Sequence, residues 1–345
     1  MDMLWWNDYK NIGFTIITNQ LSVKSPREKC IAKLTDFEMN VRPLTPTLAD
    51  IALRDLNETP ERIQQDLHIL REWIKKQRHL RARTSDQFLV AFLRRCHFSL
   101  EKTKKRIDNF FSYYNVFPEV FRNRSITSRI FDINRLGVHY YPEFPRCTDK
   151  SAILIARFGQ FDPNRYNVRE IFQFIMMAME IISVENDYAT VAGVSQILDL
   201  ANITFENIKR FDRSIFERYW TWLEDCCPLR IKEVYVINAA KDIQFRIHMI
   251  KTLMKNQLAH PIRTVKSMEE LYTHIPRSNL PEEYGGSNGH IGECVAYMED
   301  LLHTYRQYFD EDTLYGCSEE LRSGDIVSYE AEFGLNGSFR MLNFD

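Results

Sequence analysis

The 345-residue sequence has no run of about eighteen uncharged apolar residues, which excludes an ordinary transmembrane helix. Its first residues include Asp2 and Asp8 and lack a basic stretch followed by an apolar one, so we expect no secretory signal. Twelve glycines and twelve prolines are too few for a fibrous or linker-dominated chain. The seven cysteines include no Cys-x-x-Cys pair, which is typical of reduced thiols in the cytosol and not of a disulfide framework or a zinc site.

Motifs of the common enzyme classes are also missing. The sequence contains no Gly-x-Gly-x-x-Gly, no Gly-x-x-x-x-Gly-Lys-Ser/Thr and no His-Glu-x-x-His. Its single Gly-x-Ser-x-Gly match runs from Gly285 to Gly289 and follows an expected helix and a proline, not a strand, so it does not predict a nucleophile elbow. The adjacent Cys226 and Cys227 precede Pro228 at an expected helix end, where buried structural thiols are more common than nucleophiles. We therefore predict no catalytic residues, no metal site and no cofactor, in a chain that is not an enzyme.

Charge is distributed unevenly along a chain whose formal net charge is only −2. From Arg71 to Arg106 twelve Lys and Arg residues oppose three acidic ones, and from Glu282 to Glu332 thirteen acidic residues oppose two Arg. The basic segment can be a solvated helical face, or it can contact nucleic acid, phospholipid headgroups or the acidic tail. It has no nucleic-acid-binding motif and no interleaved exposed aromatic residues, so we expect no nucleic-acid partner.

Helical patterns dominate the region after the first 38 residues. The triplet Thr59-Pro60-Glu61 predicts a helix start, with Thr as the N-cap, Pro in the first turn and an acid beside it. Apolar residues at helical spacing follow: Ile63, Leu67, Leu70 and Ile74. Two more helices are expected, the second of them capped by Ser99. We predict an all-helical N-terminal domain over residues 39–130, preceded by an extension over residues 1–38.

Strand and helix patterns alternate in the second half of the chain. Short apolar runs predict four strands, over residues 152–158, 193–200, 233–238 and 262–265. Helices are expected between them, over residues 168–185, 205–225 and 242–258. Such alternation indicates right-handed crossovers and a mainly parallel sheet. We expect an α/β domain over residues 131–308 and a poorly ordered acidic tail over 309–345.

The predicted α/β domain is rich in bulky apolar helices. The helix over 168–185 is apolar nearly all round and must be covered on every side. A packed core is one interpretation, and an internal pocket with adaptable methionine walls is the other. A protein that extracts a lipid also needs a movable apolar helix and a basic surface, and the sequence has candidates for both.

Five short segments occur in an order that resembles the CRAL-TRIO lipid-binding proteins. They are Phe92-Leu93-Arg94, Ile197-Leu198-Asp199-Leu200, Pro228-Leu229-Arg230, Ile237-Asn238 and Leu280-Pro281-Glu282-Glu283-Tyr284-Gly285-Gly286. The likeness covers about residues 40–310 and extends to the tocopherol-transfer, retinaldehyde-binding and clavesin groups of the family. It implies an N-terminal helical domain and an α/β domain around one buried lipid pocket, closed by a mobile gate helix.

The resemblance also assigns residues to the pocket and the gate. The implied pocket residues are Phe172, Ile175, Met179, Val194, Leu198, Phe211, Tyr219, Trp222, Leu223, Cys227 and Val234. The implied gate is the helix over 243–258, with the apolar stripe Ile243, Ile247, Ile250 and Met254. Ile175 and Met179 stand where tocopherol-binding members have serines, and Trp222 stands where they have valine. We therefore expect a bulkier, drier pocket for a ligand that differs from tocopherol or is smaller.

Members of this family bind phosphoinositide headgroups through a basic cluster beside the gate. Three residues match that cluster: Arg94, Arg230 and Lys232. Gln257 and Pro261 replace two of its cations, and Lys251 and Lys255 on the gate helix are expected to compensate in part. For Arg94 the alternative interpretation is an ion pair between the two domains.

From these patterns we predict a monomeric, cytoplasmic carrier that takes one small hydrophobic lipid into a buried pocket. The candidate ligands are a retinoid, a tocopherol-like molecule and a phospholipid. The carrier is expected to associate transiently with membranes, where phosphatidylinositol bisphosphate is the candidate headgroup. The alternative is a non-catalytic adaptor whose pocket is filled by its own side chains and whose acidic tail recruits a protein.

Overall fold

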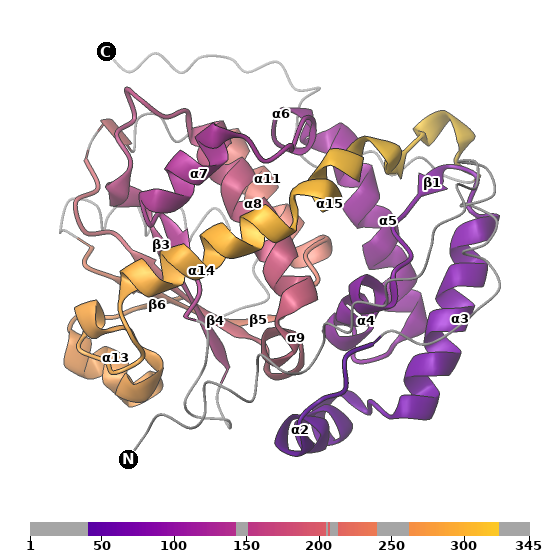
Figure 1. Cartoon of the computed structure of the whole chain (residues 1–345), viewed down its shortest axis with the longest axis horizontal. Coiled ribbons are helices and arrows are strands. Elements are labelled where there is room, and N and C mark those ends of the chain that lie inside the picture. Colours follow the sequence, from indigo (N-terminus) through magenta and orange to yellow (C-terminus); the bar gives the residue numbers. More distant parts are fainter. Residues whose placement is uncertain (1–40, 143–150, 205, 208–212, 240–261, 324–345) are drawn as a thin grey trace, which may run out of the picture. The chain divides into compact units, whose positions relative to one another are not determined.

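The structure is a computed structural model that describes residues 41–142, 151–204, 206–207, 213–239 and 262–323 (Figure 1). The predicted extension over residues 1–38 and the predicted gate helix lie outside these residues. The account below concerns the unit that begins at Asn40.

The first part of the described chain is helical, as predicted. Its helices are α2 (Pro46–Leu56), α3 (Pro60–Lys76), α4 (Asp86–Arg95), α5 (Leu100–Val116), α6 (Pro118–Phe121) and α7 (Ser128–Arg135). Helix α3 begins where the sequence indicates, because the Thr59 hydroxyl accepts the Arg62 backbone N–H at 3.2 Å and Pro60 occupies the first turn. The rings of Phe92 and Phe110, 5.5 Å apart and edge to face, pack α4 against α5.

A five-stranded sheet follows, in the order β2-β3-β4-β5-β6. Its strands are β2 (His139–Tyr140), β3 (Ala152–Arg157), β4 (Val194–Asp199), β5 (Ile231–Ile237) and β6 (Ile262–Thr264). Strands β3 to β6 are parallel and β2 pairs antiparallel with β3, which confirms the expectation of a mainly parallel sheet. A second, two-stranded sheet of β1 (Leu80–Arg81) and β7 (Gly316–Cys317) was not predicted, since two-residue strands leave no sequence pattern.

Helices connect the strands of the larger sheet. They are α8 (Val168–Glu185), α9 (Asp187–Ala192) and α11 (Arg213–Asp225), with the one-turn helix η1 (Phe158–Gln160) after β3. Helix α8 has the predicted bounds and starts with a capping box formed by Asn167 and Glu170. From Ile171 to Ser183 every residue of α8 except Gln173 is buried, as an all-round apolar helix requires. Among the helices within the described ranges, none has the length and apolarity that a membrane span needs.

Alternate residues of the strands belong to two different apolar clusters. Ala152, Leu154, Ala156, Val194 and Val234 join the larger cluster, which includes α8 and α11. Ile153, Ile155, Ile197, Tyr235 and Ile237 join a smaller cluster on the opposite face. That second face is covered by residues of α13 (Met268–His274), η3 (Glu282–Tyr284) and α14 (Ile291–Thr304). Between α13 and η3 the chain forms a further one-turn helix, η2 (Arg277–Asn279).

The acidic tail begins later than predicted. After α14 the chain continues through α15 (Arg306–Asp310), η4 (Glu311–Leu314), β7 and η5 (Glu319–Leu321), so residues 309–323 are part of the fold. The prediction was wrong for residues 309–323 because it took acidic residues as a sign of disorder, whereas Asp312 is buried in an ion pair. It accepts the Arg124 Nε–H at 2.8 Å and the Tyr114 hydroxyl at 2.7 Å. Residues 324–345 lie outside the described chain.

The helical part and the α/β part share the larger apolar cluster, which runs from Leu48 in α2 to Phe309 in α15. Buried charges also join them. Glu180, in the middle of α8, accepts from Arg124 at 2.6 Å and from the Tyr308 hydroxyl at 2.7 Å. Within residues 41–323 the predicted domains over 39–130 and 131–308 are therefore packed as one body.

Candidate functional site

The residues assigned to the lipid pocket converge on one face of the sheet. Nine of them are buried in the larger apolar cluster: Phe172, Ile175, Met179, Val194, Tyr219, Trp222, Leu223, Cys227 and Val234. Leu198 is half-buried and packs against the same cluster, whereas Phe211 lies outside the described residues. The assigned positions therefore come from α8, β4, α11, the turn after α11, and β5.

Aromatic contacts pack α8 against α11. The rings of Phe172 and Tyr219 lie 4.9 Å apart, and the rings of Tyr219 and Trp222 are nearly parallel at 6.3 Å. The Tyr219 hydroxyl donates to the Met179 sulfur at 3.8 Å. Burial raises the pKa of Tyr219, so this phenol stays neutral inside the cluster.

Gln196 adds a polar group that the sequence analysis missed. It lies between Val194 and Leu198 on β4, and strand alternation puts all three on the same face. Gln196 is 1% exposed, and within the described ranges its Oε1 atom has no hydrogen-bond partner. The Nε1–H of the fully buried Trp222 likewise has none there. The two-residue spacing from the predicted positions was the signal that could have found Gln196.

His139 is a second buried polar residue on this sheet face. It sits opposite Ala156 in the β2–β3 register and is 1% exposed. Neither ring nitrogen has a hydrogen-bond partner among the residues that the structure describes. Burial lowers the pKa of His139 to about 3, so the ring is neutral at physiological pH.

A basic cluster surrounds the N-terminal end of β5. Arg230 donates to the Val191 carbonyl at 2.7 Å, and its other terminal nitrogen lies 3.2 Å from His97 Nε2. The His97 Nδ1 atom lies 3.0 Å from the Asp55 carbonyl oxygen. Because a guanidinium only donates, His97 accepts through Nε2 and carries its proton on Nδ1. Lys232, on β5, is exposed.

The positively charged groups of this cluster repel one another electrostatically. Burial and the charges of Arg230 and Arg95 lower the pKa of His97. Burial and the neighbouring Arg106 lower the pKa of Arg95 to about 10. Although Lys232 is exposed, partial desolvation of its amino group and the charge of Arg230 lower the pKa of Lys232. The Asp55 carboxylate offsets part of this repulsion at Arg230 and Lys232.

Arg94 does not belong to this surface cluster. Its side chain is fully buried and donates to Glu58 at 2.8 and 2.9 Å, to Asp187 at 2.7 Å and to Thr190 at 3.1 Å. The structure therefore corrects the assignment of Arg94 to headgroup binding and supports the alternative, an ion pair between the helical and α/β parts. Sequence could not decide this because the two acids lie 36 and 93 positions away.

The remaining assigned residues fall in the segment that the structure does not describe. They are Ile243, Ile247, Ile250, Met254, Lys251 and Lys255, together with the substituted positions Gln257 and Pro261. The gate and its part in headgroup binding stay predictions.

The cysteine pair has the environment of structural thiols. Cys226 and Cys227 are buried and free. Burial raises the pKa of Cys227 to about 12 and raises that of Cys226 as well. Because the thiolate is the nucleophilic form, both side chains are held in their unreactive state.

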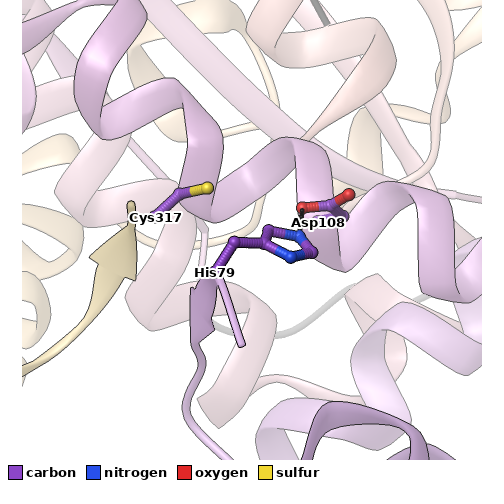
Figure 2. Close-up of side chains that lie close together, drawn as sticks. All are labelled: His79, Asp108 and Cys317. Carbon is purple, nitrogen blue, oxygen red and sulfur yellow. Dashed lines mark hydrogen bonds and ion pairs between the residues drawn. The ribbon is translucent and has the colours of Figure 1, made fainter. Parts of the chain in front are cut away.

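One group of possible metal ligands lies beside the small β1–β7 sheet. Figure 2 shows His79, Asp108 and Cys317, whose ligand atoms lie within 4.8 Å of one another. The guanidinium of Arg322 donates to Asp108 at 2.5 and 3.1 Å and to Cys317 at 3.3 Å. Burial and Glu319 raise the pKa of Cys317 to about 11, so its thiol is protonated. Arg322 thus already supplies a cation here, and we assign the cluster to fastening the C-terminal segment.

The chain is similar to several known proteins. Residues 140–286 match the family model of the CRAL/TRIO domain, and residues 59–131 match a model described as "Pinta-like, UBA domain". The chain is 27% identical over 272 residues to "Alpha-tocopherol transfer protein-like" of Homo sapiens, covering 76% of this chain and 78% of that protein. It is 24% identical over 261 residues to "Clavesin-1" of Rattus norvegicus, covering 74% and 72%.

Among solved structures the chain is similar to the crystal structure of Sfh5, with a TM-score of 0.42 and 12% identity, covering 79% of this chain and 100% of that chain. Residues 140–286 match the CRAL/TRIO model, and the resemblance to the CRAL-TRIO family that the sequence indicated is confirmed.

Proposed function

We propose that this chain is a non-catalytic carrier that holds one small hydrophobic lipid against the α8 and α11 face of the sheet and releases it at an anionic membrane. The CRAL/TRIO match supports a lipid-binding transfer protein in general. The observation that carries the proposal is the convergence of the assigned pocket residues, from four elements, on one buried apolar face. Candidate ligands are retinoids, tocopherol-like molecules and phospholipids.

Apolar burial alone can hold such a ligand reversibly. Removing about 300 Å² of ligand surface from water contributes roughly 7 kcal/mol at about 25 cal/mol per Å². Part of this is offset by the lost translational and rotational freedom of the ligand. Binding without any covalent chemistry is therefore tight enough for carriage and weak enough for release.

Arg230 and Lys232 support the membrane step. They lie at the start of β5, and in the sequence the predicted gate over residues 243–258 follows that strand directly. Each Lys or Arg near an anionic bilayer contributes about 1 kcal/mol of attraction. We propose that contact with anionic headgroups, phosphatidylinositol bisphosphate among them, brings the gate to the bilayer.

Native mass spectrometry of the full-length chain, followed by organic extraction, tests lipid carriage and the monomeric state together. The expected result is a single-chain mass with one lipid, which extraction identifies. An empty protein that also takes up no retinoid, tocopherol or phospholipid from vesicles would contradict the proposal and point to the adaptor with a filled interior.

The membrane step has its own test. Replacing Arg230 and Lys232 together by Ala is expected to weaken binding to vesicles that contain phosphatidylinositol bisphosphate by about thirtyfold, because two attractive charges of about 1 kcal/mol each are lost. The amount of lipid bound per chain should not change. The control is Lys75→Ala with Lys76→Ala, an equal charge change on exposed positions of α3. Equal effects of the two double variants would show that only net charge matters.

A further inference from the structure

At the candidate pocket, Gln196 Oε1 and Trp222 Nε1 are buried without partners among the described residues, and the larger apolar cluster contains two more such atoms, the Tyr141 hydroxyl and Trp220 Nε1. The side chains of Gln196 and Trp222 are nearly or fully buried, at 1% and 0% exposure. Most buried polar atoms of folded proteins have a hydrogen-bond partner, so two unpaired ones in a candidate ligand site call for an explanation. We propose that the lipid is an uncharged alcohol whose hydroxyl group binds between Gln196 and Trp222. This inference rests on the proposed carrier function.

Tyr219 connects the two unpaired atoms. Its hydroxyl donates to the Met179 sulfur, and the hydroxyl oxygen accepts from the Gln196 side chain. That contact uses the Gln196 amide N–H and so leaves its carbonyl oxygen free as an acceptor. The ring of Tyr219 stacks on Trp222 at 6.3 Å. The free acceptor and the free donor therefore belong to two residues that both contact Tyr219.

The hydrogen-bonding chemistry of Gln196 Oε1 and Trp222 Nε1 determines which polar group of a lipid fits here. An indole N–H only donates and an amide oxygen only accepts, so a hydroxyl group satisfies both at once. An aldehyde or ketone accepts from Trp222 but leaves Gln196 Oε1 unpaired. A carboxylate needs a cation, and the two fully buried guanidiniums of the described chain, those of Arg94 and Arg124, are each already paired with two acids.

Retinol, retinaldehyde and retinoic acid provide a direct test because they share one hydrocarbon and differ only in the head. The full-length chain is incubated with phosphatidylcholine vesicles that hold one retinoid each, and the bound fraction is measured by native mass spectrometry. We expect retinol to bind about fivefold more tightly than retinaldehyde, the usual factor for one hydrogen bond. Retinoic acid should bind more weakly still.

Variants separate the two contacts. Gln196→Leu should bring retinol down to the level of retinaldehyde and leave retinaldehyde unchanged, whereas Trp222→Phe should weaken both. Ser195→Ala, on the opposite face of β4, is the matched control and should preserve the preference. Thermal unfolding of each variant confirms folding, and Gln196→Met repeats the test if the Leu variant does not fold.

The outcomes distinguish this inference from the proposed function. Equal binding of the three retinoids by the unmodified chain, or an unchanged preference in Gln196→Leu, would overturn the hydroxyl site and leave the carrier standing. Uptake of none of the three would contradict the carrier itself, and the hydroxyl site with it.

Discussion

Replacing Arg94 distinguishes a structural ion pair from a headgroup ligand. Arg94→Met keeps most of the side-chain volume but removes the charge, which leaves Glu58 and Asp187 without their main cation. Glu58 is only 6% exposed. Breaking a buried pair by removing one partner typically lowers the free energy of unfolding by about 3–5 kcal/mol. Asp187 keeps contacts to Arg42 at 2.9 Å and Gln87 at 2.8 Å, so we expect the lower part of that range, about 3 kcal/mol.

Urea unfolding followed by circular dichroism measures this loss. A second variant that combines Arg94→Met with Glu58→Gln should recover about 1–2 kcal/mol, because no uncompensated carboxylate remains at position 58. Arg54→Met is the surface control. Its guanidinium is exposed beside Asp55, and we expect no measurable change in the unfolding midpoint.

The reasoning fails if Arg94→Met unfolds at the same urea concentration as the unmodified chain. If that stable variant also bound phosphatidylinositol bisphosphate vesicles more weakly, the ion-pair assignment would be refuted. The headgroup role that the family resemblance implies would then be restored.

Two further predictions concern buried ionisable residues. The folded pKa of His139, about 3, is below the unfolded value of about 6.5, so its contribution to stability is complete above pH 6.5 and is lost as pH falls toward 3. When the pH falls from 7 to 5, the free energy of unfolding of the unmodified chain should therefore decrease by about 2 kcal/mol more than that of His139→Leu, as measured by urea unfolding. Equal decreases would contradict a neutral buried ring. Asp312→Asn should lower the free energy of unfolding by about 3 kcal/mol and make residues 309–323 the first site of limited proteolysis, since Arg124 loses a carboxylate partner. The exposed Asp310→Asn is its control, and equal proteolysis of both would count against the role of Asp312.

Hydrophobic periodicity determined most of the secondary structure. The bounds of α8 follow from a segment that is apolar nearly all round, begins after the capping Asn167 and ends at Glu185, and both features are local. The parallel sheet followed from the alternation of strands with helices, because a parallel connection needs a crossover of that length. The candidate pocket positions on α8, β4, α11 and β5 were assigned from the family resemblance and not from local patterns, and they stay predictions.

Tertiary structure alone decided which polar groups are paired. Arg94, Arg124 and Asp312 are charged residues that a sequence places at the surface by default, yet each is buried against partners far along the chain. Gln196 is the reverse case, a polar residue on an apolar face whose oxygen has no partner within the described ranges. The physical reason is range: helix and strand patterns arise from neighbouring residues, whereas the energy of a buried charge or amide depends on groups that only folding brings within 3 Å or so.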